Sequence, residues 1–186
     1  MPPHVANPRT EAQQAHSSNF TQISKLSSYM KEAHLVGLHG QAVREKNSTK
    51  RINKDCFTPD GEIDYPRIVV SKGSVPMVSI TSAVIEDGCL TVNFDSHAYD
   101  GAATDRLFLF VYSPALCAGF LADPVLRSAG HITALLPDEW LQTAATNASD
   151  NTNTLTHSHN QTFHLYAFLQ GYRLRTSDSV HKKLEI

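Results

Sequence analysis

Two segments in the second half of the chain are apolar at almost every position: residues 106–112 (RLFLFVY) and residues 163–169 (FHLYAFL). Strands that are near-continuous hydrophobic runs are typically buried on both faces. Each segment therefore predicts a central strand, and Pro114 ends the first one because proline cannot donate to a sheet ladder. The rest of the chain must supply material to cover both faces of these strands.

A β-hairpin is predicted around Asp87-Gly88, which separates two alternating segments, residues 75–85 and 89–94. A type I′ turn needs positive φ at both central residues, and an Asp-Gly pair provides it. In the second arm one face is expected to be apolar: Leu90, Val92 and Phe94. In the first arm the alternation places four residues on one face: Val78, Ile80, Ser82 and Val84.

The remaining β-rich segments are short. Residues 68–70, 131–136 and 177–183 are strand candidates, and residues 116–126 form an edge strand or a loop. About seven strands with no helix between them indicate a mainly β, antiparallel, two-sheet sandwich. The expected core is Leu90, Val92, Phe94, Leu107, Leu109, Val111, Ile132, Leu135, Phe163, Leu165, Ala167 and Leu169.

An amphipathic helix is predicted ahead of the sandwich. Thr10 and Gln13 have the spacing of a capping box, and Gly37 and Gly40 interrupt the helical pattern. We expect a helix over residues 10–36, a break at 37–40, and a weaker helical piece over 41–47. The apolar stripe of the helix consists of Ile23, Leu26, Met30 and Ala33.

The predicted organisation is a helical arm and linker over residues 1–61, followed by a β-sandwich domain over residues 62–186. An apolar helix stripe must be buried somewhere, either on the sandwich or on another molecule. The stripe therefore predicts packing on the sandwich, or a protein partner or self-association through Ile23, Leu26, Met30 and Ala33.

Composition excludes several classes of protein. The formal net charge of -2 argues against a nucleic-acid binder, and the basic run over residues 44–54 lacks interleaved aromatics. No run of 18 apolar residues is present, so no membrane-spanning helix is predicted. The first thirty residues lack the order of a signal peptide, and a cytoplasmic or virion-associated location is the default expectation.

Searches for catalytic motifs find no GxSxG elbow, P-loop, dinucleotide fingerprint or HExxH sequence. The pairs Cys117–His131 and Cys89–His97 lack an orienting third group, and Cys89 and Cys117 are expected to be small core residues. Most carboxylates fall in turns, where they serve local hydrogen bonding. We predict no catalytic residue and no cofactor.

Two places invite a metal hypothesis. His157 and His159 lie in a stretch rich in Asn, Thr and Ser, which favours a solvated, mobile loop. Asp95, Asp100 and Asp105 surround one loop, but their spacing does not match an EF-hand. We predict no metal site at either place.

Three strings resemble a domain of unknown function that is widespread in Bacteroidetes and also occurs in their phages. They are residues 7–14 (NPRTEAQQ), residues 62–74 (EIDYPRIVVSKGS), and residues 164–168 (HLYAF) with 177–179 (SDS). The resemblance implies an immunoglobulin or fibronectin type III-like sandwich behind a helical arm, and it supplies no site residues. Members carry a segment ahead of Asn7, so we expect a trimmed N-terminus, and the linker over residues 47–53 is shorter than expected.

Two functional hypotheses follow. The first is a non-enzymatic structural or protein-interaction module, and the phage association suggests a virion or mobile-element component. The alternative is a carbohydrate-binding or other ligand-binding sandwich, or a hydrolase, that uses its loop ends. In that alternative an aromatic platform would be formed by Trp140, Tyr99 and Tyr112, whereas Trp140 would otherwise cap the core.

Overall fold

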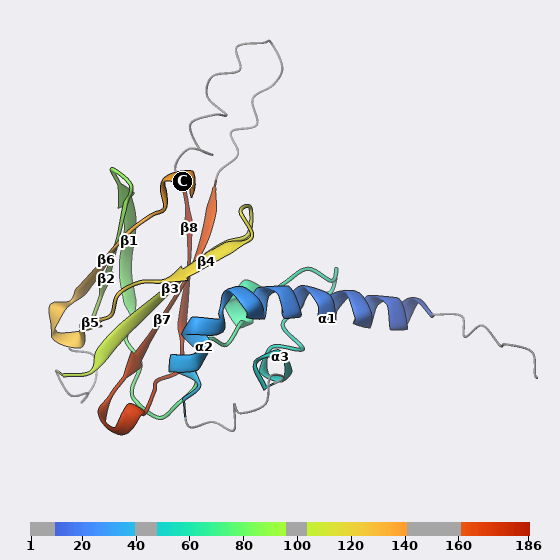
Figure 1. The fold of residues 1–186 in the computed structure, drawn as a ribbon, viewed down its shortest axis with the longest axis horizontal. Coiled ribbons are helices and arrows are strands. Elements are labelled where there is room, and N and C mark those ends of the chain that lie inside the picture. The colour runs from blue at the N-terminus through green and yellow to red at the C-terminus, as the bar shows by residue number, and fades with distance from the viewer. Residues whose placement is uncertain (1–9, 40–47, 96–103, 141–160) are drawn as a thin grey trace, which may run out of the picture.

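Two antiparallel β-sheets packed face to face form the body of the computed structural model, which describes residues 10–39, 48–95, 104–140 and 161–186 (Figure 1). The smaller sheet has the order β1 (Ile80–Glu86), β2 (Cys89–Phe94), β6 (His131–Leu135). The larger sheet has the order β4 (Ala118–Leu121), β3 (Arg106–Ser113), β7 (Thr162–Gln170), β8 (Val180–Glu185), and β5 (Val125–Leu126) also pairs with β3.

This strand order confirms the predicted fold class. In the lettering of immunoglobulin-like sandwiches, β1, β2 and β6 are strands A, B and E, and β4, β3, β7 and β8 are C′, C, F and G. The two apolar runs are the adjacent strands β3 and β7, paired with Leu109 opposite Ala167. Both strands are buried on both faces, as their sequences predict.

The inner core lies between the two sheets and contains all but one of the residues expected there. The exception is Leu135, which is 80% exposed, so that prediction is wrong. In β6 it is Ile132 and Ala134 that point inward, followed by Leu136 just beyond the strand. Because side chains alternate along a strand, Leu135 must point outward.

The hairpin at Asp87-Gly88 is confirmed, since both residues have positive φ, 47° and 76°. The face predicted for β1 is wrong. A register shift between Ile80 and Ser82 adds one residue opposite β2, which reverses the alternation beyond it. Val84 is therefore exposed, while the residues packed on the core are Ile80, Ala83 and Ile85.

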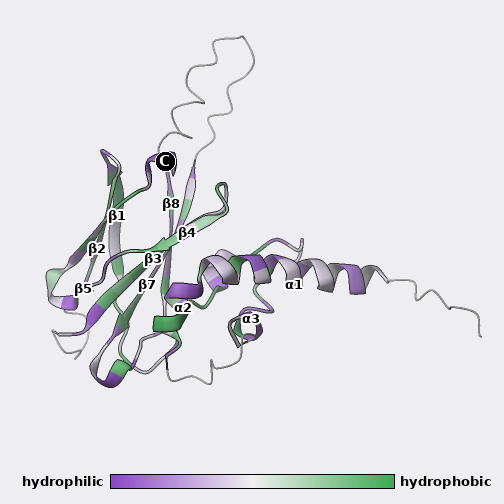
Figure 2. Cartoon of the chain, in the orientation of Figure 1, coloured by the Kyte–Doolittle hydropathy of each residue, from purple (hydrophilic) through white to green (hydrophobic). Residues whose placement is uncertain are grey.

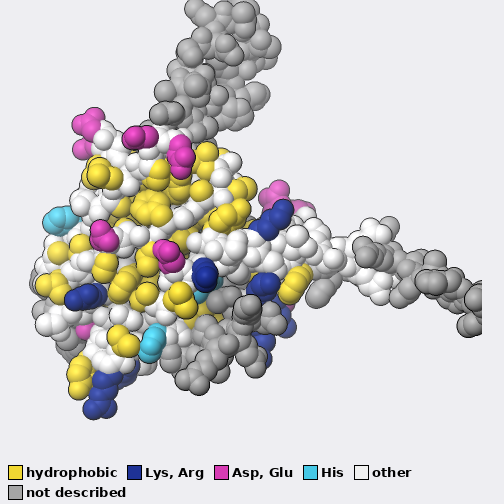
Figure 3. Space-filling view, viewed as in Figure 1, with side chains coloured by type: hydrophobic (Ala, Val, Ile, Leu, Met, Phe, Trp, Pro, Cys, Tyr) yellow, Lys and Arg dark blue, Asp and Glu magenta, His cyan; other side chains and the backbone are white. Residues whose placement is uncertain are grey.

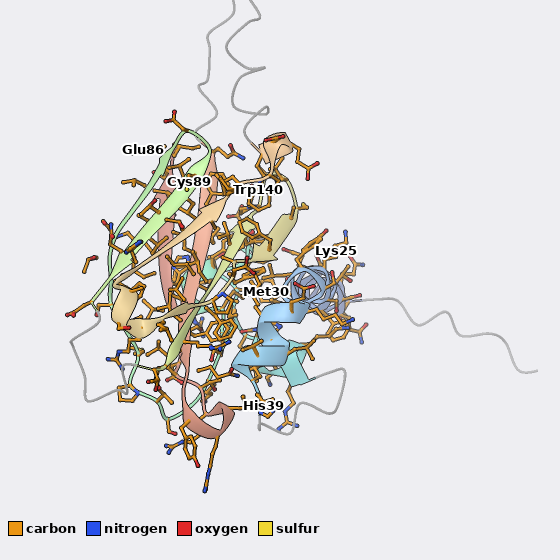
Figure 4. All side chains as sticks on the ribbon, turned by 60° about the vertical axis from the view of Figure 1, so that its left-hand side comes forward. Lys25, Met30, His39, Glu86, Cys89 and Trp140 are labelled. Carbon is orange, nitrogen blue, oxygen red and sulfur yellow. The ribbon has the colours of Figure 1, made fainter. Side chains whose placement is uncertain are left out.

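The outer face of the larger sheet is covered by α1 (Glu11–Tyr29), α2 (Lys31–Gly37) and the segments around them (Figure 1). The capping box of Thr10 and Gln13 is present as predicted. The helix expected over 10–36 is divided at Met30, which is the C-cap of α1 and lies beside the larger sheet (Figure 4). The helical piece expected over 41–47 lies outside the described residues, and α3 (Ser48–Ile52) follows it.

The apolar stripe of the helices is buried within the chain. Its four members are at most 3% exposed: Ile23, Leu26, Met30 and Ala33. They join a second core with outward-facing side chains of β3 and β7: Phe108, Phe110, Tyr112, Tyr166 and Phe168. Most of the rest of α1 is hydrophilic or neutral (Figure 2), as expected for a helix with one buried face. Partner contact through the stripe stays a prediction.

The segment between the helices and β1 is extended rather than part of a sheet. It contains the short 3-10 helix η1 (Tyr65–Arg67), and the expected strand at residues 68–70 forms no ladder. Side chains bind its backbone instead: Asn53 bonds both polar groups of Val69, and Ser179 accepts from the Val70 N–H. Further 3-10 turns are η2 (Arg127–Ala129) and η3 (Tyr172–Leu174). Among the described residues, no helix is both long and apolar enough to cross a membrane.

Candidate functional site

The cysteine–histidine pairs suggested by the sequence are not brought together. Cys117 lies in the turn between β3 and β4, where its Sγ donates to the Pro114 carbonyl at 3.5 Å. It is exposed, so its expected place in the core is wrong. β4, which follows Cys117, pairs with the Ser113 end of β3. His131 comes shortly after β5, which pairs with the opposite, Arg106 end of β3, so the two side chains lie near opposite ends of this strand. Cys89 is half-buried at the start of β2, and His97 lies outside the described residues.

The buried cysteine of the chain is Cys56. Burial raises the pKa of its thiol, and the Sγ donates to the Arg67 carbonyl at 3.1 Å. A thiolate is the nucleophilic form of cysteine, so a raised pKa lowers reactivity. Cys56 therefore acts as a hydrogen-bond donor that holds the segment around η1.

The acidic residues do not gather around an ion. The Asp105 carboxylate is buried and lies 3.8 Å from the buried guanidinium of Arg127. The backbone N–H of Arg127 also donates to the Asp105 carbonyl. Asp100, His157 and His159 lie outside the described residues. Within the described parts of the chain, no three His, Cys, Asp or Glu side chains are grouped so that they could hold a metal ion.

The aromatic platform of the ligand-binding hypothesis is not formed. Trp140 is 3% exposed, stacks on Phe163 with ring centroids 5.8 Å apart, and meets the Phe120 ring edge-on. Tyr112 is buried on the opposite face of the larger sheet, and Tyr99 lies outside the described residues. Trp140 therefore caps the inner core (Figure 4).

A cluster of histidine and tyrosine rings lies on the outer face of β7 and β8, beneath η1. The ring of Tyr65 stacks on His164 at 3.9 Å, and Tyr166 donates its hydroxyl proton to the Tyr65 carbonyl. His164 in turn lies within hydrogen-bond distance of His181, 2.9 Å between Nδ1 and Nε2. The sequence places His164 in a predicted central strand but does not reveal its contact with His181, which depends on the pairing of β7 with β8.

Burial controls the ionisation of this cluster. It lowers the pKa of His164 to about 4, with smaller contributions from the charges of His181 and Lys183. It also lowers the pKa of His181, which the Asp64 carboxylate opposes, and it raises the pKa of Tyr65. These groups are neutral near pH 7 and are engaged in ring stacking and hydrogen bonds, which indicates a structural role.

A groove of about 540 Å³, lined mostly by apolar side chains, lies between the edge strands of the two sheets, β6 and β4. We call this lining the edge surface: Cys89, Phe120, Leu121, Ala122, Asp123, Thr133, Ala134 and Leu135. Figure 3 shows hydrophobic side chains gathered on this face of the molecule, above the helices. Among the described residues, the helices cover a different face and leave the groove uncovered (Figure 1).

A second hollow of about 350 Å³ lies on the other side of β4 and shares Phe120 and Leu121 with the edge surface. Its remaining lining comes from the helix junction, β3 and β4: Ser28, Tyr29, Lys31, Glu32, Phe110 and Gly119. Phe120 and Leu121 of β4 therefore line both hollows. The sequence does not predict this surface, because its pattern places Leu135 in the core and is typical of an edge strand or a loop over residues 116–126.

Comparison with known proteins adds little to this geometry. No protein-family model and no curated protein matches the chain. The crystal structure of the rat CD45 extracellular region, domains d3–d4, is similar with a TM-score of 0.37 and 12% sequence identity. The similar region covers 62% of this chain, and the chain spans about half, 52%, of that structure. The fold assignment therefore rests on the strand order.

Proposed function

We propose that the chain is a non-enzymatic protein-interaction module that binds its partner through the edge surface. One observation carries the proposal: a groove lined mostly by apolar side chains lies between two sheet edges, on a face that the helices leave uncovered. Contiguous apolar patches rimmed by polar residues are typical of protein contact sites. The edge surface has such a rim in Asp123 and Thr133.

The exposure of individual side chains supports a protein partner. Leu135 is 80% exposed beside the groove, while Ala134 next to it is buried. A large exposed aliphatic side chain next to a concave lining can act as an anchor that a partner buries. Phe120 is half-buried in the groove, and its ring packs edge-on against the Trp140 ring of the inner core. This contact holds the Phe120 ring in place before any partner binds.

The placement of the titratable groups supports a non-enzymatic role. His164 and Tyr166 lie in the buried cluster beneath η1, on the outer face of the larger sheet. General acid–base catalysis needs a titratable group within reach of a substrate atom. The side chains that line the groove are mostly apolar, which suits burial by a protein surface better than proton transfer.

The partner class follows from the sequence. Because residues 7–14 and 62–74 resemble a Bacteroidetes and phage-associated domain, the partner in this proposal is another component of a phage or mobile-element particle. Phage structural genes next to the gene for this chain would support that assignment. Polysaccharide-utilisation genes in that position would contradict it.

A peptide-display selection against the full chain tests the binding surface. Selected peptides should bind the wild type and lose at least about tenfold in affinity for Leu135→Asp, because the charge removes the apolar anchor. Val84→Asp is the matched control, since Val84 is an exposed aliphatic residue on β1 of the same sheet. The control should bind as the wild type does.

Two results would contradict the proposal. Peptides whose affinity is unchanged by Leu135→Asp but reduced by Val84→Asp would place the contact surface elsewhere. A specific ligand on a glycan array, with binding abolished by Trp140→Ala in a folded variant, would favour carbohydrate binding instead.

A further inference from the structure

We infer that β6 pairs with β6 of a second copy of this chain, antiparallel and about a two-fold axis, which joins the two smaller sheets into one continuous sheet. This inference rests on the proposed function, because β6 borders the edge surface. It adds a second copy of the chain as one binding partner at this surface, and a mode of contact, which is backbone pairing rather than side-chain docking alone.

The hydrogen bonds on either side of β6 determine which backbone groups face outward. Leu136 N–H donates to the Gly88 carbonyl, and Phe94 N–H donates to the Gly130 carbonyl, both at 2.9 Å. In an antiparallel pair the bonded positions alternate, so Ile132 and Ala134 direct their N–H and C=O groups toward β2. The groups of the alternate residues therefore point to the open edge: His131, Thr133 and Leu135.

The other sheet edges carry features that discourage pairing. The edge strand β1 contains the register shift between Ile80 and Ser82, and β8 carries Lys182 and Lys183. β4 has only four residues, one of them Gly119. Bulges, lysines and short length are the devices by which proteins protect sheet edges.

β6 is also short, at five residues, but it carries no bulge and no lysine. Its five residues include no proline and no Asp, Glu, Lys or Arg, and it pairs with β2 without a register shift. Two of its outward side chains, Thr133 and Leu135, suit a strand pair, since one is β-branched and the other is a large aliphatic residue. An edge of this kind is a template for another strand.

A second copy of β6 can pair with the first antiparallel, about a two-fold axis. The outward-facing backbone groups are centred on Thr133, so an antiparallel copy places Thr133 opposite Thr133 and His131 opposite Leu135. No β6 side chain then faces a like charge, and a Thr–Thr pair is favourable in a sheet. Because the other described sheet edges carry protecting features, the edge that this chain itself offers to β6 is β6 of a second copy.

A contact through one short strand and its neighbouring side chains buries little surface. We therefore expect a weak dimer, with Kd on the order of 100 μM. The full chain should sediment as a monomer at roughly 10 μM and largely as a dimer at roughly 1 mM.

Sedimentation velocity on the wild type and three variants tests the inference. Thr133→Lys places two lysines opposite one another, and Thr133→Pro removes an outward N–H without removing a bond to β2. Both should raise Kd at least about tenfold. Val84→Lys, on the far edge strand β1, should dimerise as the wild type does. Circular dichroism confirms that each variant is folded.

Hydrogen exchange at the two concentrations gives a second measurement. In the wild type the amides of His131, Thr133 and Leu135 should exchange more slowly at the high concentration, because their N–H groups become bonded across the pair. A dimer that persists in Thr133→Lys, or whose protection falls on other strands, would overturn the inference.

The inference and the proposed function fail in different ways. A wild type that stays monomeric at roughly 1 mM, yet whose selected peptides lose affinity for Leu135→Asp, would overturn the β6 pairing and leave the binding surface in place. A β6-paired dimer, together with selected peptides whose affinity is unchanged by Leu135→Asp, would support the pairing and contradict the proposed binding surface.

Discussion

The imidazole rings of His164 and His181 meet across β7 and β8, with Nδ1 of the first 2.9 Å from Nε2 of the second. One ring must donate and the other accept, so the contact requires a lone pair on one nitrogen and tolerates at most one extra proton. Tyr65 covers the ring of His164, which is 5% exposed, and burial disfavours its charged form. The pair therefore links the stability of this face to pH.

Acid should destabilise the chain through His164. Its folded-state pKa of about 4 lies below the usual value of 6.5, so the unfolded state binds the proton first as pH falls. The contribution is complete above pH 6.5, is lost progressively between pH 6.5 and 4, and amounts to about 2–3 kcal/mol. His34, which burial also holds at a pKa of about 4, adds a similar dependence.

Urea unfolding at neutral pH and near pH 4.5 measures this effect. His164→Phe keeps the ring stacking without a titratable group, and its unfolding free energy should fall less between the two pH values than that of the wild type. His39→Gln, at an exposed position after α2, should behave as the wild type. Equal losses in His164→Phe and the wild type would contradict the assignment.

The helix stripe should be essential for stability. Leu26→Asp places a charge in the core shared with Phe108 and Phe110, and it should cost at least about 3 kcal/mol in unfolding free energy. Ile23→Asp should do the same. Leu35→Asp on α2 is the control, since Leu35 is 63% exposed, and an equal loss there would argue against packing of the stripe on the sheet.

Local chemistry in the sequence was enough to predict much of the fold. The central strands, the Asp87-Gly88 hairpin and the capping box of Thr10 each depend on residues close together in the chain. The predicted faces of β1 were wrong because nothing in the sequence of residues 80–82 indicates the bulge that reverses the alternation. Leu135 was misplaced because it adjoins Leu136 in an apolar run, and alternation alone decides which of the two points inward.

The candidate site was beyond sequence analysis for a different reason. The edge surface joins residues 120–123 to residues 133–135, and their proximity depends on which strands lie at the edges of the two sheets. Periodicity predicts strands but not their order. The His164–His181 contact likewise follows from the pairing of β7 with β8.

Asn53 should be a strong stability determinant despite its polar side chain. Its carboxamide accepts from the Val69 N–H at 2.8 Å and donates to the Val69 carbonyl at 3.1 Å, in place of a neighbouring strand. Asn53→Ala leaves two partly buried backbone groups unpaired, which should cost about 2–3 kcal/mol. Asn93→Ala is the control: it breaks one partly buried bond to Ser82 and should cost less than about 1 kcal/mol in the same urea titration.

Gly37→Ala should reverse the usual preference of helices for alanine. In an ordinary helix interior the change stabilises by about 1 kcal/mol. Here an added Cβ would lie 2.7 Å from the Val70 carbonyl oxygen and 2.8 Å from Ser71 Cβ. Ser71 Oγ donates to the Gly37 carbonyl, which holds the two segments together and prevents an easy shift.

For Gly37→Ala we expect a net loss of about 1–3 kcal/mol in unfolding free energy, measured as a lower urea midpoint with an unchanged slope. Ser28→Ala on the exposed face of α1 should leave the midpoint unchanged or raise it, and a rise in Gly37→Ala as well would show that α2 does not dock closely on residues 70–71.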